Sequence, residues 1–346
     1  MVVGKSDGSR ISVAMAVYNG ARYLAEQLDS IARQSRAPDE LVISDNHSTD
    51  GTTKIVEAFA SSAQFPVHLH VNEFNLGIGK NFEQAIRLCT GEVICLSDCD
   101  DVWYTNKLQR IEETFSASPA VGIVFSDADL VHQDLTATGY RLWRSTPIRS
   151  QESTEILKKG PTALRALFRW RPAWCGNTMS FKAGVNSVIL PMPDQCLMRR
   201  GNHDLWIALL AACVSDAACI PEPLLAHRRH FAQETAGHDK LPPLLRLKRA
   251  RRPFVQAVPP DLDRFICDRL KSMPEASSYR DCISEIQAWA HHLSVRTGLP
   301  PRRLSRLPSI TRELISGRYH RFSNGIVSAA RDLYSAGENT HQGPAR

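Results

Sequence analysis

The sequence predicts an α/β fold in which a mostly parallel sheet is flanked by helices. Short apolar runs rich in β-branched residues alternate with amphipathic segments four times within the first 130 residues. The connections are short, as in doubly wound sheets whose strands are buried on both faces. Polar clusters stand directly after several of the apolar runs, where such sheets bind their ligands.

The elements follow one another in a regular order. Residues 11–17 read as a buried strand, a Tyr-Asn-Gly turn follows, and apolar residues at helical spacing predict a helix to about residue 35. The same alternation predicts further strands at 40–44, 67–71, 92–97 and 121–126, and further helices at 52–60, 81–89 and 107–115.

The pattern changes after about residue 133. Residues 205–213 predict an apolar helix, residues 227–230 read HRRH, and the later chain predicts helices without strands. We therefore expect a catalytic α/β domain over residues 1–239, a basic helical region over 240–335 and a flexible tail over 336–346.

The charge divides the chain in the same way. Residues 1–239 hold 23 Lys and Arg against 27 Asp and Glu, whereas residues 240–346 hold 19 against 9. A basic C-terminal third favours an anionic partner. Residues 241–252 mix leucines with four basic residues, so they fit either a helix lying on an anionic membrane or a basic helix packed on the catalytic domain. Nucleic acid is excluded as a partner, because aromatic residues that stack on bases are not interleaved with the charges.

Several classes of protein are disfavoured. GxGxxG does not follow the first strand and GxxxxGK[ST] is absent, which argues against dinucleotide-binding and P-loop proteins. The N-terminus does not read as a signal peptide, and the longest apolar run, 205–214, is about half of a membrane span. Nine scattered cysteines suggest reduced thiols. We expect a cytoplasmic protein, with a peripheral place on the inner face of the plasma membrane as an alternative.

The stretch LSDCDDVW places three aspartates, Asp98, Asp100 and Asp101, within four positions after an apolar run. One carboxylate would suffice to cap the following helix at Lys107, which is the simpler interpretation. Three carboxylates favour a divalent cation, Mg²⁺ or Mn²⁺, that carries a diphosphate. With the residues after the first two strands, they are expected to converge on one crevice.

These motifs resemble family 2 glycosyltransferases of the GT-A fold. The resemblance rests on segments in the family's order over about residues 1–235: ISVAMAVYNGARYLAEQLDSI, DELVISDNHSTDGT, NLGIGKNFEQAI, GEVICLSDCDDVW, GNHDLW and HRRHFAQ. SDCDDVW and HDLW are most similar to the rhamnosyltransferase-like branch, which uses a dTDP-linked sugar. A GT-A fold implies a Rossmann-like, mostly parallel sheet.

The resemblance implies a role for each matching residue. On the donor side, it implies that Asp45 contacts the nucleotide base. Tyr18 and Asn19, with Asn46 beside them, are implied to line the base and the ribose, and Asp98 to lie near the ribose and the phosphates. It implies that Asp100 binds the metal, that His230 lies near the metal, and that Asp101 supports the metal shell or the donor sugar. Asp204 is implied to act as the general base. Lys80 is expected either to touch the donor or to be solvated.

Asp204 can also be argued from its chemistry. A sugar hydroxyl is a poor nucleophile and needs a carboxylate that accepts its proton as it attacks. Asp204 opens an apolar helix, so the alternative is a helix-capping aspartate. His230 likewise has a structural alternative.

The chain departs from the family pattern at several positions. DNHSTD replaces the common DDGSTD, so Asn46 is neutral and His47 stands where a glycine is usual. His227 and Gln233 stand where the branch often has tyrosine and asparagine. These differences bear on the identity of the donor.

The predicted function is an inverting, metal-dependent transfer of a sugar from dTDP-rhamnose or a UDP-sugar. The expected acceptor is a hydroxyl of a glycan or lipid-linked molecule in bacterial surface polysaccharide synthesis. Two alternatives remain: a nucleotidyltransferase, and a nucleotide-sugar-binding protein without catalysis.

Overall fold

A computed structural model describes residues 8–143, 153–169, 175–194, 203–230 and 261–334. Within them, ten strands form one sheet in the order β3-β2-β1-β4-β9-β6-β10-β5, with β7 paired to β6 and β8 paired to β10. The strands are β1 Ile11–Val17, β2 Glu40–Asp45, β3 Val67–Val71, β4 Val93–Ser97, β5 Val102–Trp103, β6 Val121–His132, β7 Ala137–Arg141, β8 Glu155–Leu157, β9 Met179–Lys182 and β10 Asp216–Arg229.

Most of the sheet runs in one direction. β1, β2, β3 and β4 pair in parallel, and β6 and β10 pair in parallel with each other. β9 lies between β4 and β6 and pairs antiparallel with both, so β6 and β10 point the same way as β4. The predicted mostly parallel α/β sheet is confirmed, with β9 as an antiparallel insertion that the sequence did not reveal.

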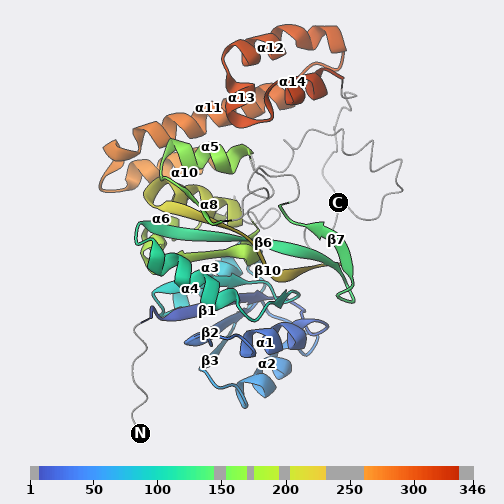
Figure 1. The fold of residues 1–346 in the computed structure, drawn as a ribbon, viewed down its shortest axis with the longest axis vertical. Helices are drawn as coiled ribbons and strands as arrows, with labels where there is room; N and C mark the ends of the chain where they lie inside the picture. The colour runs from blue at the N-terminus through green and yellow to red at the C-terminus, as the bar shows by residue number, and fades with distance from the viewer. Residues whose placement is uncertain (1–7, 144–152, 170–174, 195–202, 231–260, 335–346) are drawn as a thin grey trace.

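Two layers of helices cover the two faces of the sheet (Figure 1). Alternate residues of β1 show the division: Val13 and Met15 face one layer, and Ala14 and Ala16 face the other. The first layer consists of α1 Leu24–Ala32, α2 Thr52–Ala60 and α4 Lys107–Ala117. The second contains α3 Ile78–Leu88, α5 Pro161–Arg169, α6 Asn186–Ile189 and α8 His203–Val214.

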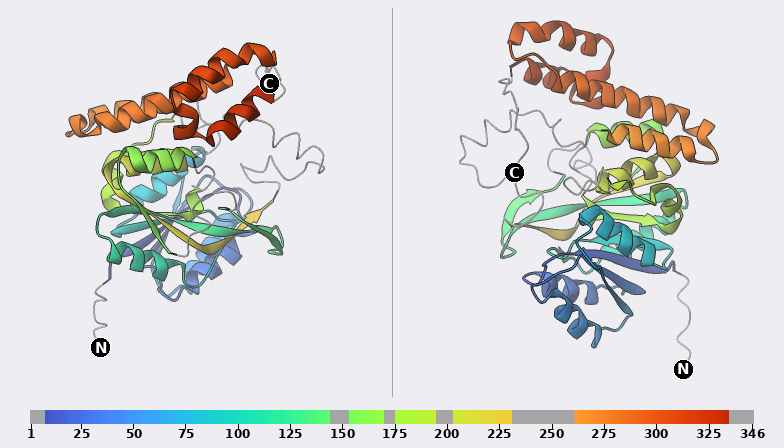
Figure 2. Two further views of the ribbon diagram at one scale, coloured as in Figure 1. Left: turned by 45° about the horizontal axis from the view of Figure 1, so that its top comes forward. Right: turned by 180° about the vertical axis from the view of Figure 1, so that it is seen from behind.

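The C-terminal helices stack on the second layer, as Figure 2 shows from two further sides. They are α10 Leu262–Ser272, α11 Arg280–Thr297, α12 Arg303–Ile315, α13 Arg318–Phe322 and α14 Gly325–Tyr334. α10 and α11 share a hydrophobic core with α5 and α8, and α12, α13 and α14 enclose a small cluster of their own. The prediction of helices without strands is confirmed for residues 261–334.

Buried Glu285 ties these helices to the rest of the chain. Its carboxylate on α11 accepts hydrogen bonds from Arg165 on α5, at 2.8 Å, and from Arg321 on α13, at 2.7 Å. Both guanidinium groups are charged, so the carboxylate joins three helices through charge-assisted hydrogen bonds.

Some predictions fall outside the described residues or stay untested. The segment 241–252, the tail 336–346 and Gln233 lie outside the described ranges, so the three-part division of the chain stays a prediction. Among the described residues, no helix combines the length and apolar character needed to cross a bilayer.

Candidate functional site

Three neighbouring strands deliver the predicted site residues to one edge of the sheet. In the parallel register, Val17 of β1 lies opposite Asp45 of β2, and Met15 lies opposite Ser97 of β4. The side chains that follow the three strand ends therefore come together. We call this set the strand-end site: Tyr18, Asn19, Asp45, Asn46, Asp98, Asp100 and Asp101.

Asp45 is the most buried member on the β2 side. Its side chain is fully buried, and Oδ2 accepts a hydrogen bond from the Ser48 amide at 2.8 Å. Its Oδ1 atom is buried and has no hydrogen-bond partner among the described residues. Because a buried acceptor without a partner is costly, this oxygen suits a donor group on a ligand.

Asn46 holds the surrounding loops together. Its side-chain nitrogen donates to Asn75 Oδ1 at 2.8 Å, and its side-chain oxygen accepts from the Leu76 amide at 2.8 Å. His47, which follows, has a φ of 66°. This left-handed conformation is the physical reason why a glycine fits well at that position.

Tyr18 and Asn19 lie on the outer side of the same edge. Tyr18 is exposed, whereas Asn19 bonds to the neighbouring loop: its amide donates to Ser48 Oγ at 2.8 Å, and its side-chain oxygen accepts from the Thr49 amide at 2.9 Å. These bonds fix the first two strand-end loops relative to each other.

The acidic cluster follows β4. Asp98, Asp100 and Asp101 each offer one carboxylate oxygen, and these three oxygens lie within 4.8 Å of one another. Burial, and then the charges of Asp101 and Asp100, raise the pKa of Asp98 well above its usual range. His230 Nε2 lies 2.7 Å from Asp100 Oδ2, so the two predicted metal ligands meet. Crowded, partly buried carboxylate oxygens with a nearby imidazole fit a Mg²⁺ or Mn²⁺ ion.

Asp101 points into the protein. Its Oδ1 accepts from the Arg228 amide at 3.0 Å and lies 3.0 Å from His227 Nδ1, and its Oδ2 accepts from the Asn177 side chain. Burial alone would raise its pKa, but His227, Asn177 and the Arg228 amide lower it. Asp101 raises the pKa of His227 in turn, against the effect of burial. Asp101 therefore anchors the acidic loop to β10, and a contact with the donor stays a prediction.

Arg228 is a second anchor, which the sequence did not single out. It is almost fully buried, stacks over the Tyr23 ring at 4.5 Å, and donates from Nε to the main-chain oxygen of Asp100 at 2.7 Å. Its guanidinium also pairs with Glu26 on α1. The resemblance implied a role only for His230 of HRRH, whereas Arg228 holds the acidic loop through the main chain of Asp100. The run PLLA directly before HRRH was the available signal of a strand.

Lys107 lies buried beneath the cluster. Its Nζ donates to the main-chain oxygen of Asn177 at 2.6 Å and lies 4.1 Å from the centre of the Trp103 ring. Burial lowers its pKa to about 8, although the charges of Asp101 and Asp98 act in the opposite direction. The sequence suggested only the start of a helix here. Asn177 thus links a buried cation to the acidic loop.

Asp204 approaches the cluster from α8. It is the second residue of that helix, and its Oδ1 accepts from the Leu205 amide at 2.6 Å. The bond of a helix-capping aspartate would instead run to an amide two or three residues ahead. The charge of Asp204 also contributes to the raised pKa of Asp98. After burial, it is the first contributor to the raised pKa of Cys175, to which Asp98 and Asp101 also contribute. Asp204 and the acidic cluster therefore lie near each other.

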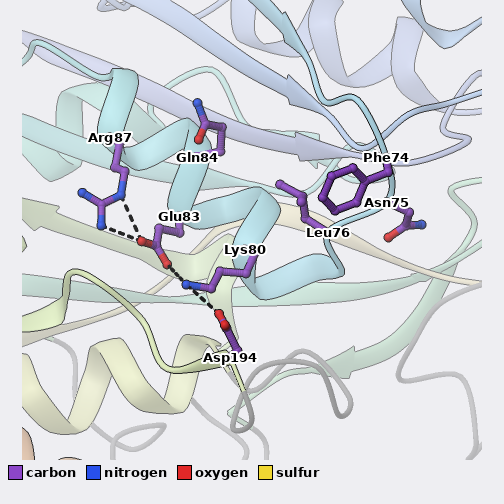
Figure 3. A pocket seen from close by; sticks show the side chains of 8 residues that line it. All are labelled: Phe74, Asn75, Leu76, Lys80, Glu83, Gln84, Arg87 and Asp194. Carbon is purple, nitrogen blue, oxygen red and sulfur yellow. Dashed lines mark hydrogen bonds and ion pairs between the residues drawn. The ribbon is translucent and has the colours of Figure 1, made fainter.

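Lys80 lies on the wall of a neighbouring pocket of about 350 Å³ (Figure 3). Its Nζ is 2.8 Å from Glu83 and 2.9 Å from Asp194, and it donates to the Met192 main-chain oxygen at 2.7 Å. These carboxylates raise its pKa, against the effect of burial. In this arrangement Lys80 joins α3 to the segment that follows α6, and a contact with the donor stays a prediction.

Comparison with known proteins bears on this geometry. The family described as Glycosyl transferase family 2 matches residues 12–163, which include β1 through β4 and the acidic cluster. Residues 12–163 are therefore similar to a family 2 glycosyltransferase domain. The dTDP-rhamnosyl transferase RfbG of Shigella flexneri is 41% identical over 101 residues, which are 28% of this chain and 35% of that protein.

A second relative names a different donor. The UDP-Glc:alpha-D-GlcNAc-diphosphoundecaprenol beta-1,3-glucosyltransferase WfgD of Escherichia coli is 30% identical over 103 residues, 30% of this chain and 40% of that protein. The chain thus spans well under half the length of these two relatives.

The same arrangement of elements occurs in a solved structure. TarS of S. aureus, residues 1–349, in complex with UDP-GlcNAc, has a TM-score of 0.57 at 15% identity, covering 94% of this chain and 88% of that one. At this identity the likeness concerns the fold, which is the GT-A glycosyltransferase fold that the sequence predicted.

Proposed function

We propose that this protein is an inverting, divalent-cation-dependent glycosyltransferase that transfers a sugar from a nucleotide diphosphate to a hydroxyl group. The observation that carries the proposal is the meeting of three groups at one edge of the sheet. These groups are the buried Oδ1 of Asp45, the acidic cluster after β4 and the carboxylate of Asp204. Asp45 Oδ1 can accept a hydrogen bond from a nucleotide base, and the acidic cluster can hold the cation of a diphosphate. Asp204 can accept the proton of an acceptor hydroxyl.

Donor binding is assigned to the ends of β1, β2 and β4 and the loops that follow them. Asp45 Oδ1 accepts a hydrogen bond from the base, and Tyr18 and Asn19 border the base and ribose. Asp100 and His230 would hold the divalent cation and Asp98 would contact the ribose and phosphates, while Asp101 keeps the loop in place through β10. A cation bound there supplies Lewis-acid neutralisation of the departing diphosphate.

Asp204 is assigned the role of general base. The hydrogen bond from the Leu205 amide and the rigid start of α8 orient its carboxylate. It accepts the proton of the acceptor hydroxyl while that oxygen attacks the anomeric carbon from the face opposite the diphosphate. One displacement inverts the configuration, and no sugar-enzyme bond forms.

The choice of donor and acceptor rests on the relatives. The similarity to RfbG favours dTDP-rhamnose, and the similarity to WfgD keeps a UDP-sugar open. The diphosphoundecaprenol-linked acceptor in the name of WfgD supports a glycan or lipid-linked acceptor in bacterial surface polysaccharide synthesis. Donors can be ranked by the thermal stabilisation that each gives with Mn²⁺, because a ligand stabilises the state it binds.

The decisive variant is Asp204→Asn, which keeps the shape of the side chain but removes its basicity. We expect the rate of nucleotide release from the best donor, with acceptor present, to fall about 10²–10⁴-fold. Donor affinity, measured by calorimetry, should stay close to that of the wild type. Asp268→Asn, an exposed acid on α10, is the matched control and should leave both unchanged. Transfer at the wild-type rate by Asp204→Asn would show that Asp204 is not the base.

A further inference from the structure

The end of the molecule formed by α12, α13 and α14 has an unusual distribution of charge. Residues 301–334 contain two acids, Glu313 and Asp332, and both are buried. Glu313 pairs with Arg318 and His292, and Asp332 pairs with Arg296 at 2.6 Å. Every exposed Asp, Glu, Lys or Arg in this described stretch is therefore an arginine.

The exposed arginines are accompanied by exposed aliphatic side chains. Leu304 and Ile315 of α12 are 80% and 83% exposed, and Leu307 is exposed as well. Leu304 and Ile315 are three helical turns apart, so they share a face of α12. Their face is opposite the side on which Ile310 and Glu313 are buried. α12 therefore carries an apolar stripe that is turned toward solvent.

This stripe has basic residues at both ends. Arg302 and Arg303 precede Leu304, and Arg312 lies one turn before Ile315; all three are exposed. We call Arg302, Leu304, Leu307, Arg312 and Ile315 the α12 face. In Figure 1, α12 lies at the end of the long axis, away from β2 and β3. Figure 2 shows it on the outside of the helical stack from two other directions.

We propose that the α12 face binds an anionic lipid surface. Exposed leucine and isoleucine side chains can enter the boundary between headgroups and acyl chains, while arginines reach the phosphates. An anionic leaflet also attracts each basic residue near it. This inference does not rest on the proposed function, although it would hold the protein beside a lipid-linked acceptor.

Two other occupants, a second copy of the chain and a nucleic acid, fit the α12 face less well. A second copy docking through the same face would bring Arg302, Arg303 and Arg312 against their own counterparts, and like charges at close range repel. A nucleic acid would leave the leucines without a function, because α12 has no aromatic side chain to stack on bases. A membrane uses both the charges and the apolar stripe.

The test is co-sedimentation of the whole protein with phosphatidylcholine vesicles, with and without phosphatidylglycerol, at low and high salt. The wild type should bind only the anionic vesicles, and more weakly at high salt. Arg302→Gln with Arg312→Gln should weaken binding about 25-fold, since each basic residue near the surface contributes about fivefold. Leu304→Ser with Ile315→Ser should weaken it about tenfold.

A matched pair of variants controls for charge. Arg33→Gln with Lys54→Gln removes two exposed cations, one directly after α1 and one on α2, at the opposite end of the molecule, and should leave vesicle binding unchanged. All these side chains are exposed, so the thermal midpoint should stay the same in every variant and thereby exclude misfolding.

Three results would overturn the proposal. They are wild-type protein that does not bind anionic vesicles, α12-face variants that bind as tightly as wild type, and light scattering that shows a dimer lost in those variants. The second would move the lipid contact to another basic segment such as 241–252. The third would make the face an interface between copies.

Discussion

The two sides of the strand-end site are built differently. The first side, residues 11–132, holds its functional groups with loops that bond to one another near the strands they follow, as Asn19 bonds to Ser48 and Thr49. The second side, residues 175–230, reaches across more than 70 residues of sequence: Asn177 and Arg228 bond to the acidic loop after β4. The first side therefore presents the donor-binding groups, whereas the second side holds the acidic loop in position and adds His230 and Asp204 to the site.

The largest effect should come from the first side. Asp100→Ala removes the carboxylate that meets His230 and should lower the transfer rate about a thousandfold, because the diphosphate loses its counter-ion. Asp29→Ala, an exposed acid on α1, is the control and should have no effect. Steady-state nucleotide release with Mn²⁺ measures both. A loss of less than tenfold in Asp100→Ala would place the cation elsewhere.

Arg228→Met should disrupt the contacts by which the second side holds the acidic loop. This change leaves the main-chain oxygens of Asp100 and Gln133 without their donor and should destabilise the protein by about 3 kcal/mol. Urea unfolding measures the loss, and donor affinity should fall with it. The exposed Arg33→Met, in a pair at 3.9 Å, should change the unfolding free energy by less than about 0.5 kcal/mol. Equal effects of the two variants would remove the distinction between the two sides.

The second side also rests on the C-terminal helices. Glu285→Gln weakens the bonds from α11 to Arg165 and Arg321 and should cost about 2 kcal/mol in urea unfolding at neutral pH. Burial alone would raise the pKa of Glu285, but the two arginines lower it below its ordinary value.

The lowered pKa of Glu285 determines how the difference in stability between the wild type and Glu285→Gln depends on pH. A carboxyl group whose pKa is lowered in the folded state stabilises the protein above its unfolded pKa of about 4.3. This stabilisation is lost as the pH falls below that value. Wild type and Glu285→Gln should thus converge in stability below about pH 4. A difference that does not shrink as the pH falls from about 4.3 through the lowered pKa of the folded state would contradict this account of Glu285.

The smallest effect should come from His47→Gly. Glycine removes the strain of the φ of 66° at this position, and we expect a gain of about 0.5 kcal/mol in unfolding free energy. His70→Gly, on exposed β3, should instead cost about 0.5–1 kcal/mol. If both variants are destabilised alike, the contact of His47 Nδ1 with the Asn72 oxygen at 3.3 Å outweighs the strain.

The sequence was informative where the chemistry follows a regular element. The strands β1 to β4 and the helices between them lie close to the predicted bounds, so the meeting of Asp45 with the acidic cluster could be foreseen. Periodicity reveals buried strands and amphipathic helices, and parallel strands bring their carboxyl ends to one edge.

The anchors could not be foreseen in the same way. The partners of Asn177, Arg228 and Lys107 are set by contacts between residues distant in sequence. β9 has four residues and pairs antiparallel between two longer strands, which no local signal announces. A buried lysine and a solvated lysine look alike in a sequence.

The central claim is that the strand-end site binds a nucleoside diphosphate through a divalent cation. The most direct test is the thermal midpoint of the wild type with UDP or dTDP, in Mn²⁺ and in EDTA. At a hundred times the dissociation constant, binding should stabilise the protein by about 2.7 kcal/mol, or roughly 5 °C, in Mn²⁺ and much less in EDTA. No shift with either nucleotide in Mn²⁺, or the same shift in EDTA, would contradict it.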